Sequence, residues 1–265
     1  MARQESSSSP FIEDRRTLLQ KSANLALSSL LGMAVSQSTN LLPADALEED
    51  DLVEVYFGCG CFWHVQHEFV QAEMKYLDRT DTKLTSRAGY AGGKAGAVNG
   101  KVCYHNAMNV ADYGKLGHAE VVSLQIPSSK FYDFAVEYCK LFRNGMRPDQ
   151  LGDRGTEYRN LVGLPGGSKS PLAQQLVQAS KDTGDQLDFG VGKGNDDDIA
   201  RLIWIMDIEK FPSYVAEAYH QFHDGFAMGE NYPDSYNSLA QKFVNKGEDF
   251  GSCPNGMMGL GVGGL

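Results

Sequence analysis

The sequence predicts an α/β (α+β) fold, a two-layer sandwich in which helices pack on a mixed β-sheet. The 265 residues are 42% hydrophobic, which is enough to bury a substantial core. With 13 Phe and 12 Tyr, the chain is too aromatic to be disordered throughout. Short β-branched and aromatic runs alternate irregularly with segments of helical periodicity, and this alternation favours a layered fold.

The first three elements lie between residues 52 and 91. Residues 52–57 are rich in β-branched and aromatic side chains and are followed by two glycines, Gly58 and Gly60, so they predict a strand. After those glycines, residues 62–74 place their apolar side chains near one face, which predicts a helix. Residues 84–91 predict a second strand that ends at a pair of glycines, and residues 95–117 are rich in Gly and Asn, as loops are.

The middle of the chain predicts one strand followed by two helices. Residues 120–126 alternate well enough for a third strand, and a proline stops it. Ser128 or Ser129 can cap a helix to about Phe142, whose apolar side chains form one continuous stripe. Ser170, followed by proline, opens another helix that extends to about residue 180.

The C-terminal part predicts a loop, a strand and two helices. Residues 184–198 are rich in Gly and Asp, as surface loops are. Residues 202–206 predict a strand, and helices are expected at 212–222 and 235–245, the second just before a Gly-rich tail. We expect the strands and helices together to form a ferredoxin-like plait.

Charge and cysteine content exclude several classes of protein. The formal net charge of −10 argues against nucleic acid as the main partner, because phosphates require a basic surface. Five cysteines are too few for a disulfide scaffold in so long a chain. Their odd number and scattered positions indicate redox chemistry more than structural cross-linking. The five are Cys59, Cys61, Cys103, Cys139 and Cys253.

Residues 1–46 predict a targeting segment. Arg15 and Arg16 precede a modest apolar run at 23–35, and Ala44-Asp45-Ala46 offers small residues at a signal-peptidase spacing. This order is typical of a twin-arginine signal, which is cleaved on export to a bacterial periplasm or on entry into the thylakoid lumen of a plastid. The apolar run is too short and too rich in serine to span a membrane. The alternative is an ordinary N-terminal segment of a cytoplasmic protein.

Cys61 lies where a predicted strand gives way to a predicted helix. A thiol at a helix N-terminus faces unpaired backbone N–H groups and the positive end of the helix dipole, and both favour the thiolate. Since the thiolate is the nucleophilic form, this position suits nucleophilic attack. Position alone is equally compatible with a small buried cysteine at a strand–helix junction.

Five local clusters follow one another along the chain. They are Gly60-Cys61-Phe62-Trp63, Gly89-Tyr90-Ala91-Gly92-Gly93, Gly117-His118-Ala119-Glu120, Asp153-Arg154-Gly155-Thr156-Glu157-Tyr158-Arg159 and Ala216-Glu217-Ala218-Tyr219-His220-Gln221. Together they resemble the peptide methionine sulfoxide reductase A family. The resemblance extends from about Val53 to Phe222. No single cluster is decisive, but five in this order are very specific.

The resemblance implies that the chain reduces methionine-S-sulfoxide, free or in peptides and proteins. Cys61 would attack the sulfoxide sulfur and become a sulfenic acid, and Glu120 would protonate the departing oxygen. The strand pattern agrees, because Glu120 shares its parity with Val122, Leu124 and Ile126 on the more apolar face. A carboxyl turned toward an apolar face tends to stay protonated, as a proton donor must.

Further site residues are implied by the same resemblance. Tyr104 and Tyr158 align with tyrosines whose hydroxyls hold the sulfoxide oxygen. Tyr113 is the alternative to Tyr104, because the chain carries extra residues between Tyr104 and Glu120. Asp153 aligns with an acidic residue that orients water or supports the cysteine.

Phe62 and Trp63 would form the pocket for the substrate's S-methyl group. An aromatic surface suits a methyl group that is apolar yet carries partial positive charge. The chain departs from the family pattern nearby. His64 replaces a glycine, Glu157 stands where glutamine is usual, and a His-Asp-Pro stretch before Asp153 is missing. These departures bear on substrate preference and efficiency more than on the type of reaction.

Turnover requires a second thiol. The resemblance implies that a tail cysteine, here Cys253, attacks the sulfenic acid and forms a disulfide that thioredoxin reduces. The tail at 246–265 is Gly-rich, so it could swing to a site in the expected catalytic domain at 47–245. Cys103, beside Tyr104, is a weaker candidate for relaying the disulfide.

Two other functions stay open. A thiol–disulfide or metal-binding protein could be built around Cys59 and Cys61, although metal sites usually show a second ligand pair at regular spacing. A non-catalytic relative could bind oxidised methionine without reducing it. For the reductase we expect no cofactor, no metal, no stable membrane association and a monomer. Cys59 and Cys139 are expected to be packing thiols.

Overall fold

The computed structural model describes residues 51–184, 187–224, 232–250 and 253–254. The predicted targeting segment at 1–46 and residues 255–265 of the predicted tail lie outside these ranges. Among the residues that are described, no helix combines the length and the apolar character needed to cross a membrane.

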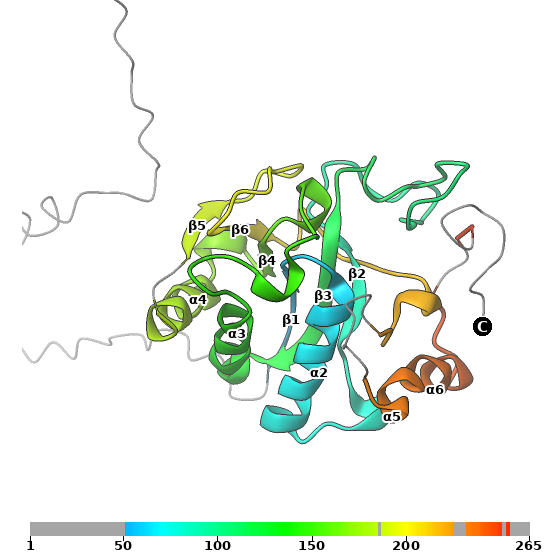
Figure 1. Cartoon of the computed structure of the whole chain (residues 1–265), viewed down its shortest axis with the longest axis horizontal. Helices are drawn as coiled ribbons and strands as arrows, with labels where there is room; N and C mark the ends of the chain where they lie inside the picture. Colours follow the sequence, from blue (N-terminus) through cyan, green and yellow to red (C-terminus); the bar gives the residue numbers. More distant parts are fainter. Residues whose placement is uncertain (1–50, 185–186, 225–231, 251–252, 255–265) are drawn as a thin grey trace, which may run out of the picture. The chain divides into compact units, whose positions relative to one another are not determined.

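Seven strands of the described chain form one mixed sheet in the order β5-β6-β4-β1-β3-β2-β7, shown in Figure 1. They are β1 (Leu52–Gly58), β2 (Arg87–Ala91), β3 (Ala119–Pro127), β4 (Leu161–Leu164), β5 (Asp188–Val191), β6 (Leu202–Asp207) and β7 (Tyr214–Val215). The pairs β4–β1, β1–β3, β3–β2 and β2–β7 are antiparallel, whereas β6 runs parallel to both β4 and β5.

The inner part of this sheet has the predicted ferredoxin-like topology. Helix α2 (Phe62–Leu77) connects β1 to β2, and α3 (Phe131–Lys140) connects β3 to β4. The chain order β1-α2-β2-β3-α3-β4 combined with the sheet order β4-β1-β3-β2 is that of a ferredoxin-like plait. The remaining strands extend it at both edges, so the predicted mixed sheet with packed helices is confirmed.

Helices cover one face of the sheet. Figure 1 shows α2, α3 and α4 (Pro171–Asp182) in front of the strands. The main core between these layers takes alternate strand residues, such as Val55 and Phe57 of β1 and Leu124 of β3. Tyr56 and Val121 have the opposite parity and belong to a smaller cluster. The short helices α5 (Asp234–Asn237) and α6 (Leu239–Asn245) pack in a third cluster that includes Val70 of α2.

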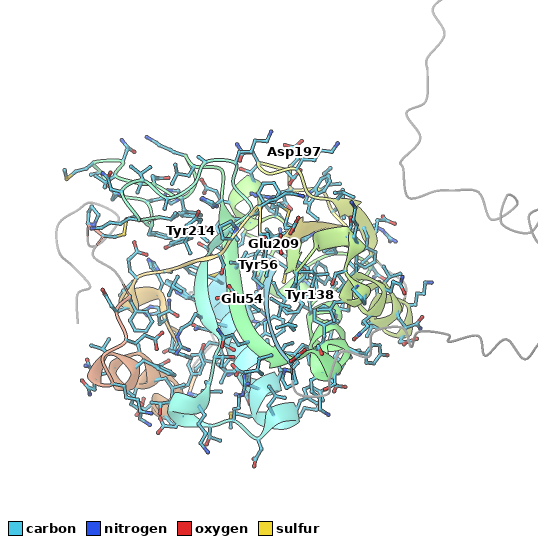
Figure 2. The ribbon with its side chains drawn as sticks, turned by 180° about the vertical axis from the view of Figure 1, so that it is seen from behind. Glu54, Tyr56, Tyr138, Asp197, Glu209 and Tyr214 are labelled. Atoms are coloured by element: carbon cyan, nitrogen blue, oxygen red, sulfur yellow. A yellow bond between two sulfur atoms is a disulfide. The ribbon has the colours of Figure 1, made fainter. Side chains whose placement is uncertain are left out.

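Two buried tyrosines hold β1 near the turn that leads to Cys61. From α3, the Tyr138 hydroxyl donates to the Gly58 carbonyl at 2.9 Å. From β1 itself, the Tyr56 hydroxyl donates to the Phe211 carbonyl at 2.9 Å. Both tyrosines are labelled in Figure 2. Since they belong to the core clusters of opposite parity, β1 is anchored on both faces of the sheet.

The predicted helix at 212–222 is wrong. Its place is taken by β7, which pairs with β2, and by a short 3₁₀ turn at Ala218–His220. The Gln221 side chain accepts the Ala88 N–H at 3.0 Å and donates to the carbonyls of Ala88 and Ala216, both at 2.9 Å. These tertiary hydrogen bonds hold the segment against β2, and the apolar spacing of the segment does not reveal them.

Other boundaries also differ from prediction. The predicted loop at 184–198 contains β5, and β4 was not predicted at all. The second strand begins only at Arg87, and the last predicted helix, 235–245, is split into α5 and α6. Both missed strands have four residues and contain a glycine, so their sequence pattern is weak.

Candidate active site

Cys61 is the N-cap residue of α2, at the end of the turn that follows β1. Gly60 has a φ of 84°, and a Cβ at this position would overlap Oε1 of Gln150, so glycine is required on both counts. The same oxygen accepts the Cys61 N–H at 2.5 Å. The Gly60 N–H donates to the Tyr158 carbonyl at 3.0 Å. The turn is therefore fixed to two segments that lie far away in sequence.

Glu120 lies at the start of β3 and is only 2% exposed. Its Oε2 accepts the Phe62 N–H at 2.9 Å, and its Oε1 accepts a hydrogen bond from the Tyr113 hydroxyl at 3.3 Å. Burial raises the pKa of Glu120 to about 8, although both hydrogen bonds lower it. The carboxyl is therefore mostly protonated at neutral pH, as the parity of the strand predicted.

The protonation of Cys61 differs from prediction. Burial raises the pKa of this thiol well above its usual value, and next the charge of Glu120, once that carboxyl is ionised, raises it further. Hydrogen bonds from the backbone N–H groups of Trp63 and His64 lower the pKa, but by less. The expectation of a resting thiolate is thus wrong, because the loss of water outweighs the helix N-terminus. The residue remains partly exposed and can be reached from solvent.

Two tyrosines lie close to Cys61 and Glu120. The pKa of Tyr104 and that of Tyr158 are raised, first by burial and then by the charge of Glu120, and Cys61 contributes to both. Both tyrosines are partly exposed, whereas Tyr113 is fully buried, with its ring 5.6 Å from that of Tyr104. The structure therefore brings four predicted site residues together. Tyr113, the alternative to Tyr104, supports Glu120 from the interior.

Asp153 belongs to the loop that leads to Tyr158. Burial raises the pKa of Asp153, and the charge of Arg147 lowers it. Its own charge raises the pKa of Cys61, which places it in the same site. Arg147 is 2% exposed and donates to the carbonyls of Asp153, at 2.9 Å, and Tyr158. No sequence motif marked Arg147 or Gln150, because both are polar loop residues whose partners are set by the fold.

Phe62 and Trp63 form one side of the site together with His220. The ring centroid of His220 lies 5.3 Å from that of Phe62, 5.8 Å from that of Trp63 and 4.3 Å from that of Tyr104. Burial lowers the pKa of His220 to about 3, so its ring is neutral. His223 extends the aromatic wall, 4.3 Å from Trp63. The predicted pocket residues are therefore in contact with each other and with this histidine pair.

Cys253 forms a disulfide with Cys103, and their Cα atoms lie 5.7 Å apart. The predicted resolving cysteine is thus paired with the weaker candidate and not with Cys61. Cys59, Cys61 and Cys139 are free thiols. Cys59 and Cys139 are buried, and burial raises the pKa of each to about 12. Both behave as the packing thiols that the sequence predicted.

In the described part of the chain, one group of side chains is spaced to hold a metal ion, namely Cys103, Glu217 and Cys253. Their candidate ligand atoms lie within 4.8 Å of one another. The two sulfurs are joined as a disulfide, so they do not offer thiolate ligands in this state. Neither Cys59 nor Cys61 belongs to the group.

Comparisons with known proteins identify relatives that match up to 76% of the chain. No family model matches the chain. A peptide methionine sulfoxide reductase MsrA of Pseudomonas putida is 30% identical over 185 residues, which are 68% of this chain and 68% of the relative. The chain belongs to this family. The MsrA of Rippkaea orientalis is 29% identical over 205 residues, which are 76% of this chain and 76% of the relative.

Coverage of other family members is smaller. The MsrA of Geobacter sulfurreducens is 32% identical over 121 residues, and the match spans 43% of this chain and 62% of the relative. Two solved structures are similar at lower identity. Methionine sulfoxide reductase A of Corynebacterium diphtheriae has 17% identity and a TM-score of 0.44, covering 70% of this chain and 85% of that one. Reduced Mxr1 from Saccharomyces cerevisiae has 19% identity and a TM-score of 0.38, and the match covers 68% of this chain and 90% of Mxr1.

Proposed function

We propose that this protein is a peptide-methionine (S)-S-oxide reductase, which converts methionine-S-sulfoxide, free or in peptides and proteins, to methionine. One arrangement carries the proposal: Glu120, mostly protonated at neutral pH, accepts the N–H of Phe62, the residue that follows the partly exposed Cys61, and it influences the pKa of that thiol. A sulfoxide needs a nucleophile at its sulfur and a proton for its oxygen, and these two residues supply them. Membership of the family supports the same reaction.

In the first step, the Cys61 sulfur attacks the sulfoxide sulfur, and the oxygen is transferred to Cys61. Glu120 donates its proton to this oxygen and regains a proton from the attacking thiol. The S–O bond of the substrate breaks, so a thiol and a sulfoxide become a sulfenic acid and a sulfide. The proton of the thiol balances the reaction, and it must leave Cys61 as the sulfur attacks, because the thiolate is the nucleophilic form.

Substrate binding falls to the residues around the thiol. The hydroxyls of Tyr104 and Tyr158 would donate hydrogen bonds to the sulfoxide oxygen, where negative charge develops. Phe62 and Trp63 would receive the S-methyl group. Asp153 would orient water near Cys61, whose pKa it influences.

In the second stage, Cys103 and Cys253 would remove the sulfenic acid. One of their thiols attacks it, releasing water and forming a disulfide with Cys61. The other thiol then displaces Cys61 as a free thiol, which leaves the Cys103–Cys253 disulfide. This disulfide is the pair present in the structure. Thioredoxin or another thiol would reduce it and would be the electron donor, with no cofactor needed.

The reaction can be tested with the purified protein, each methionine sulfoxide epimer and dithiothreitol, followed by quantification of methionine. We expect product from the S epimer only, and none after Cys61→Ser. Cys139→Ala, which changes a buried thiol on α3, serves as the matched control and should retain activity. Absence of product with the unmodified protein, or full activity of Cys61→Ser, would refute the proposal.

Thioredoxin dependence requires a separate assay. With thioredoxin and its reductase in place of dithiothreitol, Cys253→Ser should complete one turnover and then cycle at less than about a tenth of the normal rate. Unchanged cycling would remove the resolving role of Cys253.

We also propose that residues 1–46 form a cleaved twin-arginine signal for a plastid, such as its thylakoid lumen, or for a bacterial periplasm. Residues 47–245 would then form a monomeric catalytic domain and 246–265 a tail. A reporter fused to residues 1–46 should be exported, and replacing Arg15 and Arg16 by lysine should stop export. Light scattering of the purified domain measures its oligomeric state.

A further inference from the structure

Glu217 lies at the Cys103–Cys253 disulfide and is not one of the predicted site residues. One of its carboxylate oxygens is within 4.8 Å of both sulfur atoms. The two cysteines are separated by 150 residues in sequence, and Glu217 comes from a third segment, just after β7. Three distant parts of the chain therefore bring one carboxylate to one redox-active pair.

The Glu217 carboxylate is held in place by two donors. Oε1 accepts the backbone N–H of Tyr104 at 2.8 Å, and Oε2 accepts the hydroxyl of Tyr90 at 2.8 Å. Tyr104 directly follows Cys103, so the first bond also fixes the loop that carries the cysteine. An ionised carboxylate only accepts hydrogen bonds, and both neighbours donate, as that state requires.

The chemistry of disulfide formation explains why a carboxylate is useful here. A thiol must lose its proton to attack, and Cys103 is fully buried, so solvent cannot take that proton directly. Glu217 is partly exposed, so it can accept the proton and pass it to water. The other ionisable groups beside it are poor acceptors. Burial raises the pKa of Tyr90 well above its usual value, and burial lowers the pKa of His220, on the same turn, to about 3.

We propose that Glu217 is the proton acceptor for the Cys103 thiol when that thiol attacks the sulfur of Cys253 in a disulfide, such as the one that Cys253 forms with Cys61. In this step a new S–S bond to Cys103 forms, the old S–S bond breaks, and the leaving sulfur departs as a thiolate. The proton of Cys103 moves to Glu217 and then to solvent or to the leaving sulfur. No oxidant is needed beyond the disulfide being attacked, so atoms and electrons balance.

The inference deepens the proposed function, but its test does not depend on sulfoxide reduction. A Cys61→Ser protein is reduced, freed of reductant and mixed with 4,4′-dithiodipyridine, and release of thiopyridone is followed by absorbance. The partly exposed Cys253 should react first, and the buried Cys103 should then displace the second thiopyridone. A Cys61→Ser/Cys253→Ser protein defines the background from the other thiols.

We expect Glu217→Gln to slow the second release about tenfold or more near pH 7, while the first release changes less than about threefold. Glu217→Asp should recover part of the rate, and formate should rescue Glu217→Ala. Glu209→Gln, which changes an exposed carboxylate just after β6 (labelled in Figure 2), is the control and should change neither phase.

A second release at the normal rate in Glu217→Gln would overturn the inference. If the variants do not fold, the pH profile of the Cys61→Ser protein with native Glu217 decides instead. With an internal acceptor, the second release should be nearly constant between about pH 6 and 8. A rate that rises about tenfold per pH unit over that range would mean that hydroxide generates the thiolate, and the inference would be wrong. Thiopyridone release does not require sulfoxide reduction. The role of Glu217 could therefore still be supported or refuted if the proposed reductase reaction failed.

Discussion

The hydroxyl of Tyr113 lies 3.3 Å from Oε1 of Glu120, and both side chains are buried. The Phe62 N–H occupies the other carboxyl oxygen, so Glu120 is bound both to the interior and to the first residue of α2. The protonation state of the site therefore depends on the Glu120 carboxyl. This carboxyl belongs to β3, and its two hydrogen-bond donors come from α2 and from the loop before β3.

Glu120 sets the alkaline limit of the proposed reaction. Because its pKa is about 8, the acid form is lost as pH rises through that value. Single-turnover methionine formation should therefore be nearly constant from about pH 6 to 7 and should fall above about pH 8. Glu120→Gln cannot donate a proton and should be slower by a factor of about 10² to 10⁴, without that alkaline fall. A mutant with wild-type rate would exclude Glu120 as the acid.

The same substitution should stabilise the fold at neutral pH. Between a pKa of 4.5 and one of about 8, the folded state holds a proton that the unfolded state has released, so stability falls as pH rises across this window. At pH 7 the cost is about 3 kcal/mol, and Glu120→Gln removes much of it. Urea unfolding should show a more stable variant at pH 7 and no difference near pH 4. Equal stability at both pH values would contradict the raised pKa.

Tyr113 and Tyr104 should have separable effects. The hydrogen bond from Tyr113 lowers the pKa of Glu120, so Tyr113→Phe should shift the alkaline limit to higher pH, with less than about a threefold loss of rate at pH 6. Tyr104→Phe removes a hydroxyl proposed to bind the substrate oxygen, and should reduce the rate about 10- to 100-fold without moving that limit. The pH profiles of both variants, measured side by side, distinguish the two roles.

Gly60 and Gln150 should be energetically coupled. Gly60→Ala places a side chain at a φ of 84°, which costs about 1–2 kcal/mol, and also forces it into Gln150. Gln150→Ala alone should cost about 1 kcal/mol by removing the acceptor of the Cys61 N–H. The double variant should be more stable than the sum of the single changes predicts, because the overlap is gone. Gly152→Ala, where a Cβ meets no neighbour, is the control. Strict additivity would contradict the coupling.

The sequence predicted correctly those features that depend on the alternation of side chains along a single strand. The strand parity that turned Glu120 inward is a property of a few neighbouring residues, and it was confirmed by the burial of that carboxyl. The ionisation of Cys61 was predicted wrongly, since its pKa depends on burial by residues that the sequence does not bring together. Gln150 escaped prediction for the same reason, and Cys103, the partner of Cys253, was only a weaker candidate for relaying the disulfide. The apolar spacing of residues 212–222 predicted a helix, but hydrogen bonds between Gln221 and Ala88 hold this segment against β2 instead.

The Cys103–Cys253 disulfide would also make the thermal stability of the protein depend on the proposed redox cycle. A cross-link between residues 150 positions apart restricts the denatured chain, which by the loop-entropy estimate is worth roughly 5 kcal/mol. In the proposed cycle, each reduction by the electron donor removes that restriction and each turnover restores it. The oxidised resting form should therefore melt at a higher temperature than the reduced form that is ready to react, so a shortage of reductant would leave the protein inactive but protected from unfolding.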